Sequence, residues 1–254
     1  VDCYAAYLVT LANSSDNTTL IESLDGKENC NVVLEDRTFY RNNTWNTICL
    51  PFDTEIAGSP LEGADVRTLS GITREGETVT LIFSDEGTIN EIKAGRPYII
   101  KWDNTESLVE PLFTGVTIDK TKRDIVCVID NDVPGSPSIG VTFKGTYSYI
   151  AFTDTDDSIL FVGATNRLNY PLSGATIGAQ KAFFQLEGIT ANAAISGVKR
   201  YVLDFGEDNP TIIHEIANDN SADGEWYDIN GRKLSGKPSL RGVYIQNDKK
   251  VLVK

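Results

Sequence analysis

The chain has 254 residues, 41% of them hydrophobic, so it is long enough to bury a sizeable core in one large domain or two smaller ones. Its 23 basic and 36 acidic residues give a net charge of −13, which argues against nucleic acid or anionic lipid as a partner. No run of about 20 consecutive apolar residues occurs, so we expect no transmembrane segment. The start at Val1, without a basic leader, indicates a mature form or a piece cut from a longer precursor.

Residues 1–30 are expected to form an N-terminal segment with one short helix. In "SSDNTTLIESLDGKE" a Ser or Asp offers an N-cap, Leu20, Ile21 and Leu24 supply apolar positions, and Gly26 gives a stop signal. The sequence contains no helical pattern of comparable strength after this segment.

Residues 31–206 are expected to form the main antiparallel β domain. Short runs rich in β-branched and aromatic residues recur with turn signals between them, as in "DVRTLSGITREGETVTLIFSDEG", "GVTFKGTYSYIAF" and "QKAFFQLEGI". Helical patterns do not alternate with these runs. The pattern therefore predicts an all-β fold, an antiparallel β-sandwich or a barrel-like domain.

The four cysteines are too far apart for a CxxC motif, which disfavours zinc knuckles and thioredoxin chemistry. Cys49 and Cys127 lie in apolar strand-like runs and are predicted to be buried free thiols. Cys3 and Cys30 flank the N-terminal segment, and both a disulfide and two free thiols are compatible with the sequence.

The end of the chain is predicted to be a small β-hairpin module over residues 225–254, after an acidic linker over 207–224. "YDINGRKL" carries Asn-Gly, a strong hairpin signal. "GVYIQNDKKVLVK" is predicted to form a second hairpin, with a tip of either two residues, "ND", or three, "NDK". Because a small hairpin module is marginal in water, we expect it to fold only against the main domain.

The sequence "WYDINGRKLSGKPSLRGVYIQNDKKVLVK" resembles the carboxy-terminal end of a type IX secretion sorting domain of Bacteroidetes. The runs "LEDRTFYRNNTWNTICLPFD", "AGRPYIIKW" and "ATIGAQKAFFQL" resemble a β-rich domain of uncharacterised surface proteins of gut Bacteroidetes. These resemblances imply an extracytoplasmic place, secreted or attached to the cell surface. The second family has no agreed catalytic residues, so it implies none here.

Signals for catalysis are weak. The single histidine, His214, stands beside Glu215 and is better interpreted as an ordinary surface or packed residue than as a general base. The sequence has no GxSxG, no HExxH and no Gly-rich phosphate loop. A β-fold glycoside hydrolase would need only two suitably spaced carboxylates, which the sequence cannot single out.

Calcium has one candidate site. Asp219, Ser221 and Asp223 occupy positions one, three and five of a loop that begins like an EF-hand, but Asn230 stands where a bidentate acid is expected. The acidic-linker interpretation is therefore preferred, and "DTDD" at 154–157 is interpreted as a solvated turn. We predict no catalytic residues, no metal and no cofactor.

Five aromatic residues are candidates for sugar stacking: Trp45, Trp102, Trp226, Tyr147 and Tyr149. The alternative is that they fill a sandwich core. The function expected from these observations is a non-enzymatic structural or adhesive interaction at the cell surface, with a protein or glycan as ligand. A glycan-binding module is the alternative, and a β-fold glycoside hydrolase is a weaker one.

Overall fold

The computed structural model describes residues 6–85, 87–103, 106–129, 138–163, 166–191 and 197–206, together with the backbone of the strands at 226–227, 242–246 and 249–253. The chain divides into two compact units, Val1–Ile216 and Ala217–Lys254. None of the described helices is long and apolar enough to cross a membrane.

The predicted all-β fold is confirmed. In the described residues the helical structure is α1 (Thr18–Ser23), inside the stretch predicted to be helical. The strands are β1 (Tyr7–Ala12), β2 (Cys30–Glu35), β3 (Thr38–Phe39), β4 (Asn46–Ile48), β5 (Thr54–Glu55), β6 (Asp65–Glu75), β7 (Thr78–Ser84), β8 (Glu91–Ile92), β9 (Tyr98–Lys101), β10 (Leu108–Val109), β11 (Leu112–Val116), β12 (Ile125–Ile129), β13 (Ile139–Thr146), β14 (Ile150–Ala151), β15 (Ile159–Val162), β16 (Leu168–Asn169), β17 (Thr176–Ile177), β18 (Lys181–Glu187), β19 (Arg200–Asp204), β20 (Trp226–Tyr227), β21 (Gly242–Gln246) and β22 (Lys249–Val253).

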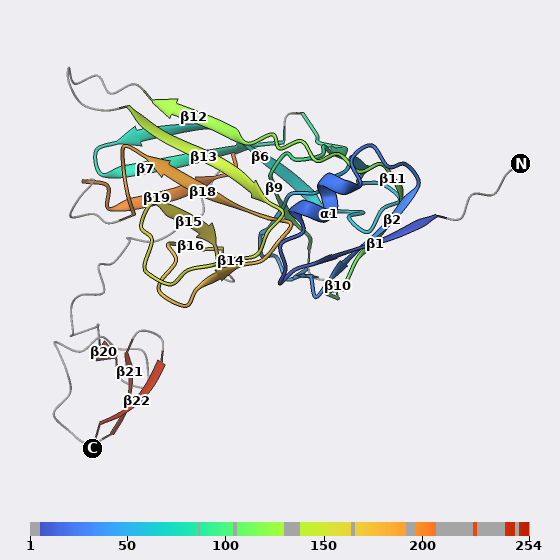
Figure 1. Cartoon of the computed structure of the whole chain (residues 1–254). Helices are drawn as coiled ribbons and strands as arrows, with labels where there is room; N and C mark the ends of the chain where they lie inside the picture. The colour runs from blue at the N-terminus through green and yellow to red at the C-terminus, as the bar shows by residue number, and fades with distance from the viewer. Residues whose placement is uncertain are drawn as a thin grey trace, which may run out of the picture. The chain divides into compact units, whose positions relative to one another are not determined.

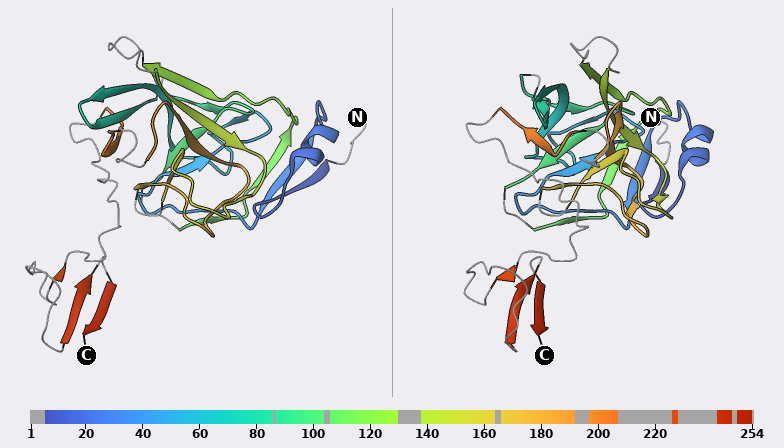
Figure 2. Two further views of the ribbon diagram at one scale, coloured as in Figure 1. Left: turned by 60° about the vertical axis from the view of Figure 1, so that its left-hand side comes forward. Right: turned by 90° about the vertical axis from the view of Figure 1, so that its left-hand side faces the viewer.

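Two five-stranded sheets enclose one of the two large cores of the first unit (Figures 1 and 2). One has the order β19-β7-β6-β9-β4 and the other the order β12-β13-β18-β15-β16. Their inner side chains form one apolar cluster, in which the Phe143 and Phe184 rings stack at 4.7 Å and Phe83 meets each edge-on at 6.0 Å. Burial of such aromatic side chains is a large favourable term in folding, and it holds the two sheets together in a sandwich-like arrangement.

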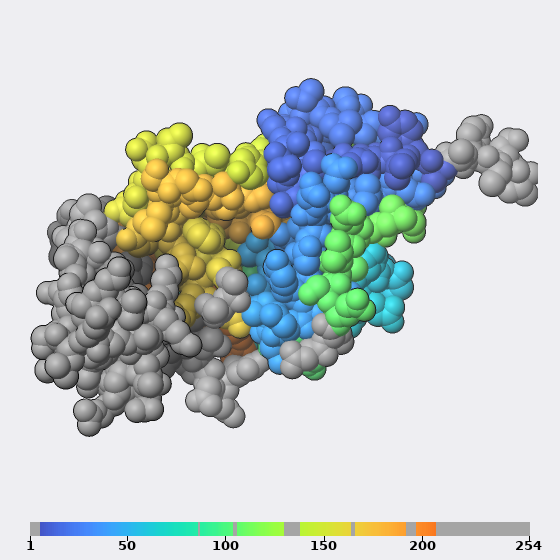
Figure 3. Space-filling model, turned by 90° about the horizontal axis from the view of Figure 1, so that it is seen from below, coloured from blue at the N-terminus to red at the C-terminus, as the bar shows by residue number. Residues whose placement is uncertain are grey.

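A second core lies at the other end of the same unit, beneath α1 and the sheet β1-β2-β11. In the space-filling view the N-terminal residues, in blue, occupy one end of this unit, while the later yellow and orange strands occupy the other (Figure 3). Ile21 is the buried residue of α1, and the Phe52 and Phe113 rings lie 5.2 Å apart in this core.

The strand β1 was not expected from the sequence. Its backbone pairs in parallel with β2, and its buried residues are Val9 and Leu11. The exposed positions Tyr7 and Leu8 are also large and apolar, so the alternation that normally marks a strand is lost there. A second parallel pair, β19 with β7, also departs from the purely antiparallel expectation.

In the second unit, β20, β21 and β22 form an antiparallel sheet. Tyr244 pairs with Val251 and Gln246 with Lys249, which is the register of the two-residue tip and not of the three-residue one. The Asn-Gly turn lies outside the described residues. That this unit needs the main domain in order to fold stays a prediction.

The cysteines follow the expectation only in part. Cys49 is fully buried and free, as predicted, whereas Cys127 is only half-buried because it lies on β12, at an edge of its sheet. Cys30 is also buried and free, and Cys3 lies outside the described residues.

Candidate functional site

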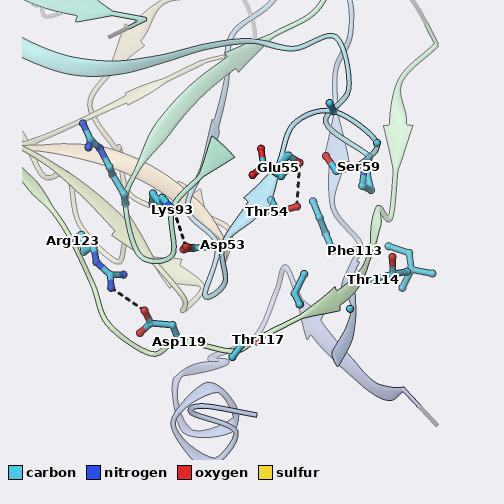
Figure 4. Close-up of a pocket in the computed structure, with 17 residues that line it drawn as sticks. Asp53, Thr54, Glu55, Ser59, Lys93, Phe113, Thr114, Thr117, Asp119 and Arg123 are labelled. Atoms are coloured by element: carbon cyan, nitrogen blue, oxygen red, sulfur yellow. Dashed lines mark hydrogen bonds and ion pairs between the residues drawn. The ribbon is translucent and has the colours of Figure 1, made fainter. Parts of the chain in front are cut away.

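The candidate site is a polar pocket of about 810 Å³ on the first unit (Figure 4). Its walls come from β5 with the following 57–60 loop, from the turn between β8 and β9, and from β11 with the segment that follows it. Binding pockets for small molecules commonly have volumes of about 300–1,000 Å³, so this pocket is large enough for a ligand.

Asp53 holds one side of the pocket together. Its Oδ1 accepts a hydrogen bond of 2.7 Å from the backbone N–H of Ala94, and its Oδ2 lies 3.1 Å from Lys93 Nζ. Lys93 also reaches Glu91 Oε2 at 2.6 Å. Partial burial acts to raise the pKa of Asp53, but the Ala94 N–H and Lys93 outweigh it, so the pKa is lowered. The Lys93 pKa is raised, first by Glu91 and then by Asp53.

Asp119 and Arg123 form the second ion pair of the pocket. Asp119 Oδ2 lies 2.9 Å from Arg123 Nη2, and Asp119 Oδ1 accepts a 2.8 Å hydrogen bond from the Thr121 N–H. Partial burial again opposes ionisation, yet the hydrogen bonds from Thr121 and Arg123 prevail and lower the pKa of Asp119 to about 2. Arg123 also donates to the carbonyl oxygen of Ala94, which ties this segment to the β8–β9 turn.

Two local backbone features shape the walls of the pocket. Gly95, at φ +71°, lets the turn approach Thr121, because a Cβ there would collide with the Thr121 carbonyl. On the opposite wall the register of β11 with β2 shifts between Phe113 and Val116. This irregularity turns Thr114 and Gly115 outward, while Phe113 remains buried in the core.

The charged side chains that line the polar pocket have no net charge in total. Three carboxylates and three cations line the pocket: Asp53, Glu55, Asp119, Lys93, Arg96 and Arg123. Thr54, Ser59, Thr114 and Thr117 add hydroxyl groups to the lining (Figure 4). Carboxylates accept hydrogen bonds and guanidinium and ammonium groups donate them, so the pocket offers both kinds of partner without a net charge.

Of the candidates for sugar stacking whose side chains the structure describes, most follow the core alternative. Trp45, Trp102 and Tyr147 are buried in the two cores, and only Tyr149 of the described set is exposed. Their polar atoms serve the fold, since Trp102 Nε1 donates to the Glu62 carbonyl at 3.1 Å. The strand-like runs that contain them place their rings inward, as the core alternative anticipated. The Trp226 side chain lies outside the described residues.

The remaining residues considered from the sequence are the calcium loop, His214 and the 154–157 stretch. Asp219, Ser221 and Asp223 lie outside the described residues, as does His214, so the calcium hypothesis stays a prediction. The 154–157 stretch is a turn in which Asp156 Oδ1 accepts hydrogen bonds from the backbone and hydroxyl of Ser158. Within the described ranges, no three His, Cys, Asp or Glu side chains cluster to hold a metal ion.

The pocket residues were not singled out from the sequence. Asp53, Lys93 and Asp119 stand in three separate segments, and no motif joins them. A partial signal exists in "KAGRP", where Gly95 marks a tight turn. In comparisons with known proteins, no family model, no curated protein and no solved structure matches this chain.

Proposed function

We propose that this chain is a non-enzymatic adhesive binding protein, and that its ligand in the polar pocket is a neutral, hydroxyl-rich glycan. The observation that carries the proposal is the charge balance of an 810 Å³ pocket lined by three carboxylates and three cations. Sugar hydroxyls both donate and accept hydrogen bonds, so they match a lining that presents donors and acceptors together.

The paired state of the charges favours a neutral ligand over an ionic one. Lys93 is shared by Asp53 and Glu91, and Arg123 is held by Asp119. An anionic ligand at Lys93 or Arg123 would have to displace a carboxylate, and a cationic ligand at Asp53 or Asp119 would have to displace a cation. A neutral glycan adds hydrogen bonds to groups whose orientation is already fixed, which limits the entropy lost on binding.

The recognition would rest on hydrogen bonding. Phe113, the aromatic residue of the lining, is buried and packs on Phe52. Ring stacking, one of the two roles considered for the tryptophans, is therefore not available from Trp45 or Trp102, and affinity for a single sugar unit should be modest.

A glycoside hydrolase is a poorer fit to this pocket. Such an enzyme needs a general acid, a carboxyl group whose raised pKa keeps it protonated near neutral pH. The pKa values of Asp53 and Asp119 are lowered, so both are ionised at pH 7. Neither is suited to protonate a leaving group.

The extracytoplasmic, cell-surface place of the protein is part of the proposal and rests on the sequence resemblances to Bacteroidetes surface proteins. The acidic composition is compatible with it, because a net charge of −13 limits self-association in a soluble or surface-exposed protein.

A glycan array followed by calorimetry with the best glycan tests the proposal. Thr114→Trp would fill the pocket from its exposed position on β11, and Thr73→Trp makes the same change at an exposed position of β6, outside the pocket. We expect Thr114→Trp to weaken binding at least tenfold and Thr73→Trp to bind like the wild type. A wild-type protein that retains no glycan, or equal binding by Thr114→Trp, would refute the proposal.

A further inference from the structure

A second, smaller cavity of about 180 Å³ lies on the first unit, apart from the polar pocket. It is lined by residues of the β2–β3 turn and of the segment leading into β4, together with the ends of β15 and β18. Two cations contribute to its walls, Arg37 and Lys181.

Arg37 is buried, with 5% of its surface exposed. It follows Asp36, whose φ of 57° turns the chain at the end of β2. Its Nη2 donates a 2.7 Å hydrogen bond to the Thr47 carbonyl, and its guanidinium carbon lies 4.4 Å from the centre of the Phe39 ring. The Nε atom is buried and has no hydrogen-bond partner. An arginine offers five N–H donors, and the Nε–H of this one is an unused donor in a buried place.

Lys181 begins β18 and adds a second positive charge. In the described part of the chain, no ion pair joins Arg37 or Lys181 to a carboxylate. Burial, and then the charge of Arg37, lower the pKa of Lys181 to about 8. Burial likewise lowers the pKa of Arg37 to about 9. Burial is the first cause of both shifts, and the charge of Arg37 adds to the shift of Lys181.

Leaving a buried cation unpaired is costly, and an anion between the two cations would remove that cost. At roughly 30 Å³ for each water molecule, the cavity has room for only a few, which matches a small oxyanion and excludes an oligosaccharide as a whole. Thr38, Thr44 and Tyr40 add hydroxyl groups to the lining. An arginine fork suits the paired oxygens of carboxylate, sulfate or phosphate.

We propose that this cavity binds a small oxyanion, a sulfate, phosphate or carboxylate group, between the Arg37 guanidinium and the Lys181 ammonium. The anion is either a free inorganic ion or the charged group of a larger acidic ligand that reaches the cavity from outside. The site is separate from the polar pocket, so neither proposal depends on the other.

Calorimetry on the full chain tests the site with sodium sulfate, sodium phosphate and sodium acetate, each against sodium chloride at the same ionic strength. We expect one oxyanion to bind with 1:1 stoichiometry and to raise the melting temperature above its value in chloride. Lys181→Met should weaken this binding at least tenfold. Lys144→Met, a partly buried lysine on the neighbouring strand β13 that does not line the cavity, should bind like the wild type.

Weaker anion binding by Lys181→Met could come from loss of the site or from loss of the fold. The melting temperature of this variant in chloride distinguishes the two. Removing one of two unpaired like charges should leave that temperature unchanged or higher. A sulfated disaccharide that binds at least tenfold more tightly than sulfate identifies the group as part of a larger ligand, and equal affinities identify a free anion. Oxyanions that raise the melting temperature no more than chloride does, or equal anion binding by Lys181→Met, would overturn the proposal.

Discussion

Asp53 Oδ1 accepts a 2.7 Å hydrogen bond from the backbone N–H of Ala94, although the two residues are 41 positions apart in the chain. This bond joins the start of β5 to the turn between β8 and β9. Two walls of the polar pocket are thus fixed to each other by one carboxylate, which also holds the ammonium group of Lys93.

Asp53→Ala should lower the free energy of unfolding by about 1 kcal/mol. The change removes the acceptor of the Ala94 N–H, and a hydrogen bond to a charged group contributes about 1.5–3 kcal/mol, which the half-exposed position of Asp53 reduces. Urea denaturation measures the loss. Glu77→Ala, which breaks the exposed Glu77–Lys199 ion pair of 2.7 Å, is the control and should change stability by less than about 0.5 kcal/mol. Equal effects of the two changes would contradict this role of Asp53.

Stability should fall as the pH is lowered from about 5 toward 2. The pKa of Asp119 is about 2 in the folded chain, against an ordinary value of 3.8 that represents the unfolded chain. Because the folded state binds its proton less readily, this stabilisation is present above the unfolded pKa and is lost as the pH falls through the folded one. Urea titrations at pH 7, 5 and 3 measure it. The dependence should be weaker in Asp119→Asn, and an unchanged slope in that variant would argue against the assignment.

Gly145→Ala should destabilise the protein by about 1–3 kcal/mol. Gly145 on β13 lies against Cys49, and a Cβ at this position would collide with the Cys49 Sγ inside the core. Gly71→Ala on β6 is the matched control, because its Cβ would have an ordinary contact of 4.0 Å with Ile82 Cδ1. Thermal unfolding compares them. A Gly145→Ala variant as stable as Gly71→Ala would show that this close approach does not constrain the core.

Cys49 should resist thiol reagents in the native state. Burial raises its pKa to about 12, so the reactive thiolate is scarce, and its side chain is inaccessible. Cys127 is only half-buried and should react faster than Cys49, although burial also raises its pKa. Timed labelling with mass spectrometry resolves the two sites. Labelling of Cys49 in buffer at the rate seen in concentrated urea would contradict its native burial.

Strand periodicity was sufficient to predict most of the main domain. The runs around "REGE" became β6 and β7, which pair across that turn. In β7 buried residues alternate with partly exposed ones, and β6 follows a similar pattern except near the register shift at Leu69. The strand β1 could not be found in this way, because Tyr7 and Leu8 are apolar and exposed. Parallel pairing with β2 depends on chain topology that a local pattern does not encode.

Neither site could be predicted from the sequence, for a related reason. Asp53 and Asp119 come together only because the β8–β9 turn lies between their segments, and each is an ordinary acidic residue in its local context. Arg37 stands in the strand-like run "LEDRTFYR", and arginine is mostly exposed in folded proteins. Its burial beside Lys181 follows from the packing of the β2–β3 turn against β4 and β18, which are distant in sequence from each other.

Amide chemical-shift mapping by NMR locates the glycan on the protein, when the best glycan from the array is titrated into the full chain. If the polar pocket is the binding site, the largest shifts occur at residues 53–59, 93–96, 112–119 and 123, which include every lining residue except Pro60, a proline without an amide proton. We predict that the same titration of Thr114→Trp leaves these shifts small. Shifts centred elsewhere on the chain, with the pocket amides unchanged, would contradict glycan binding in this pocket.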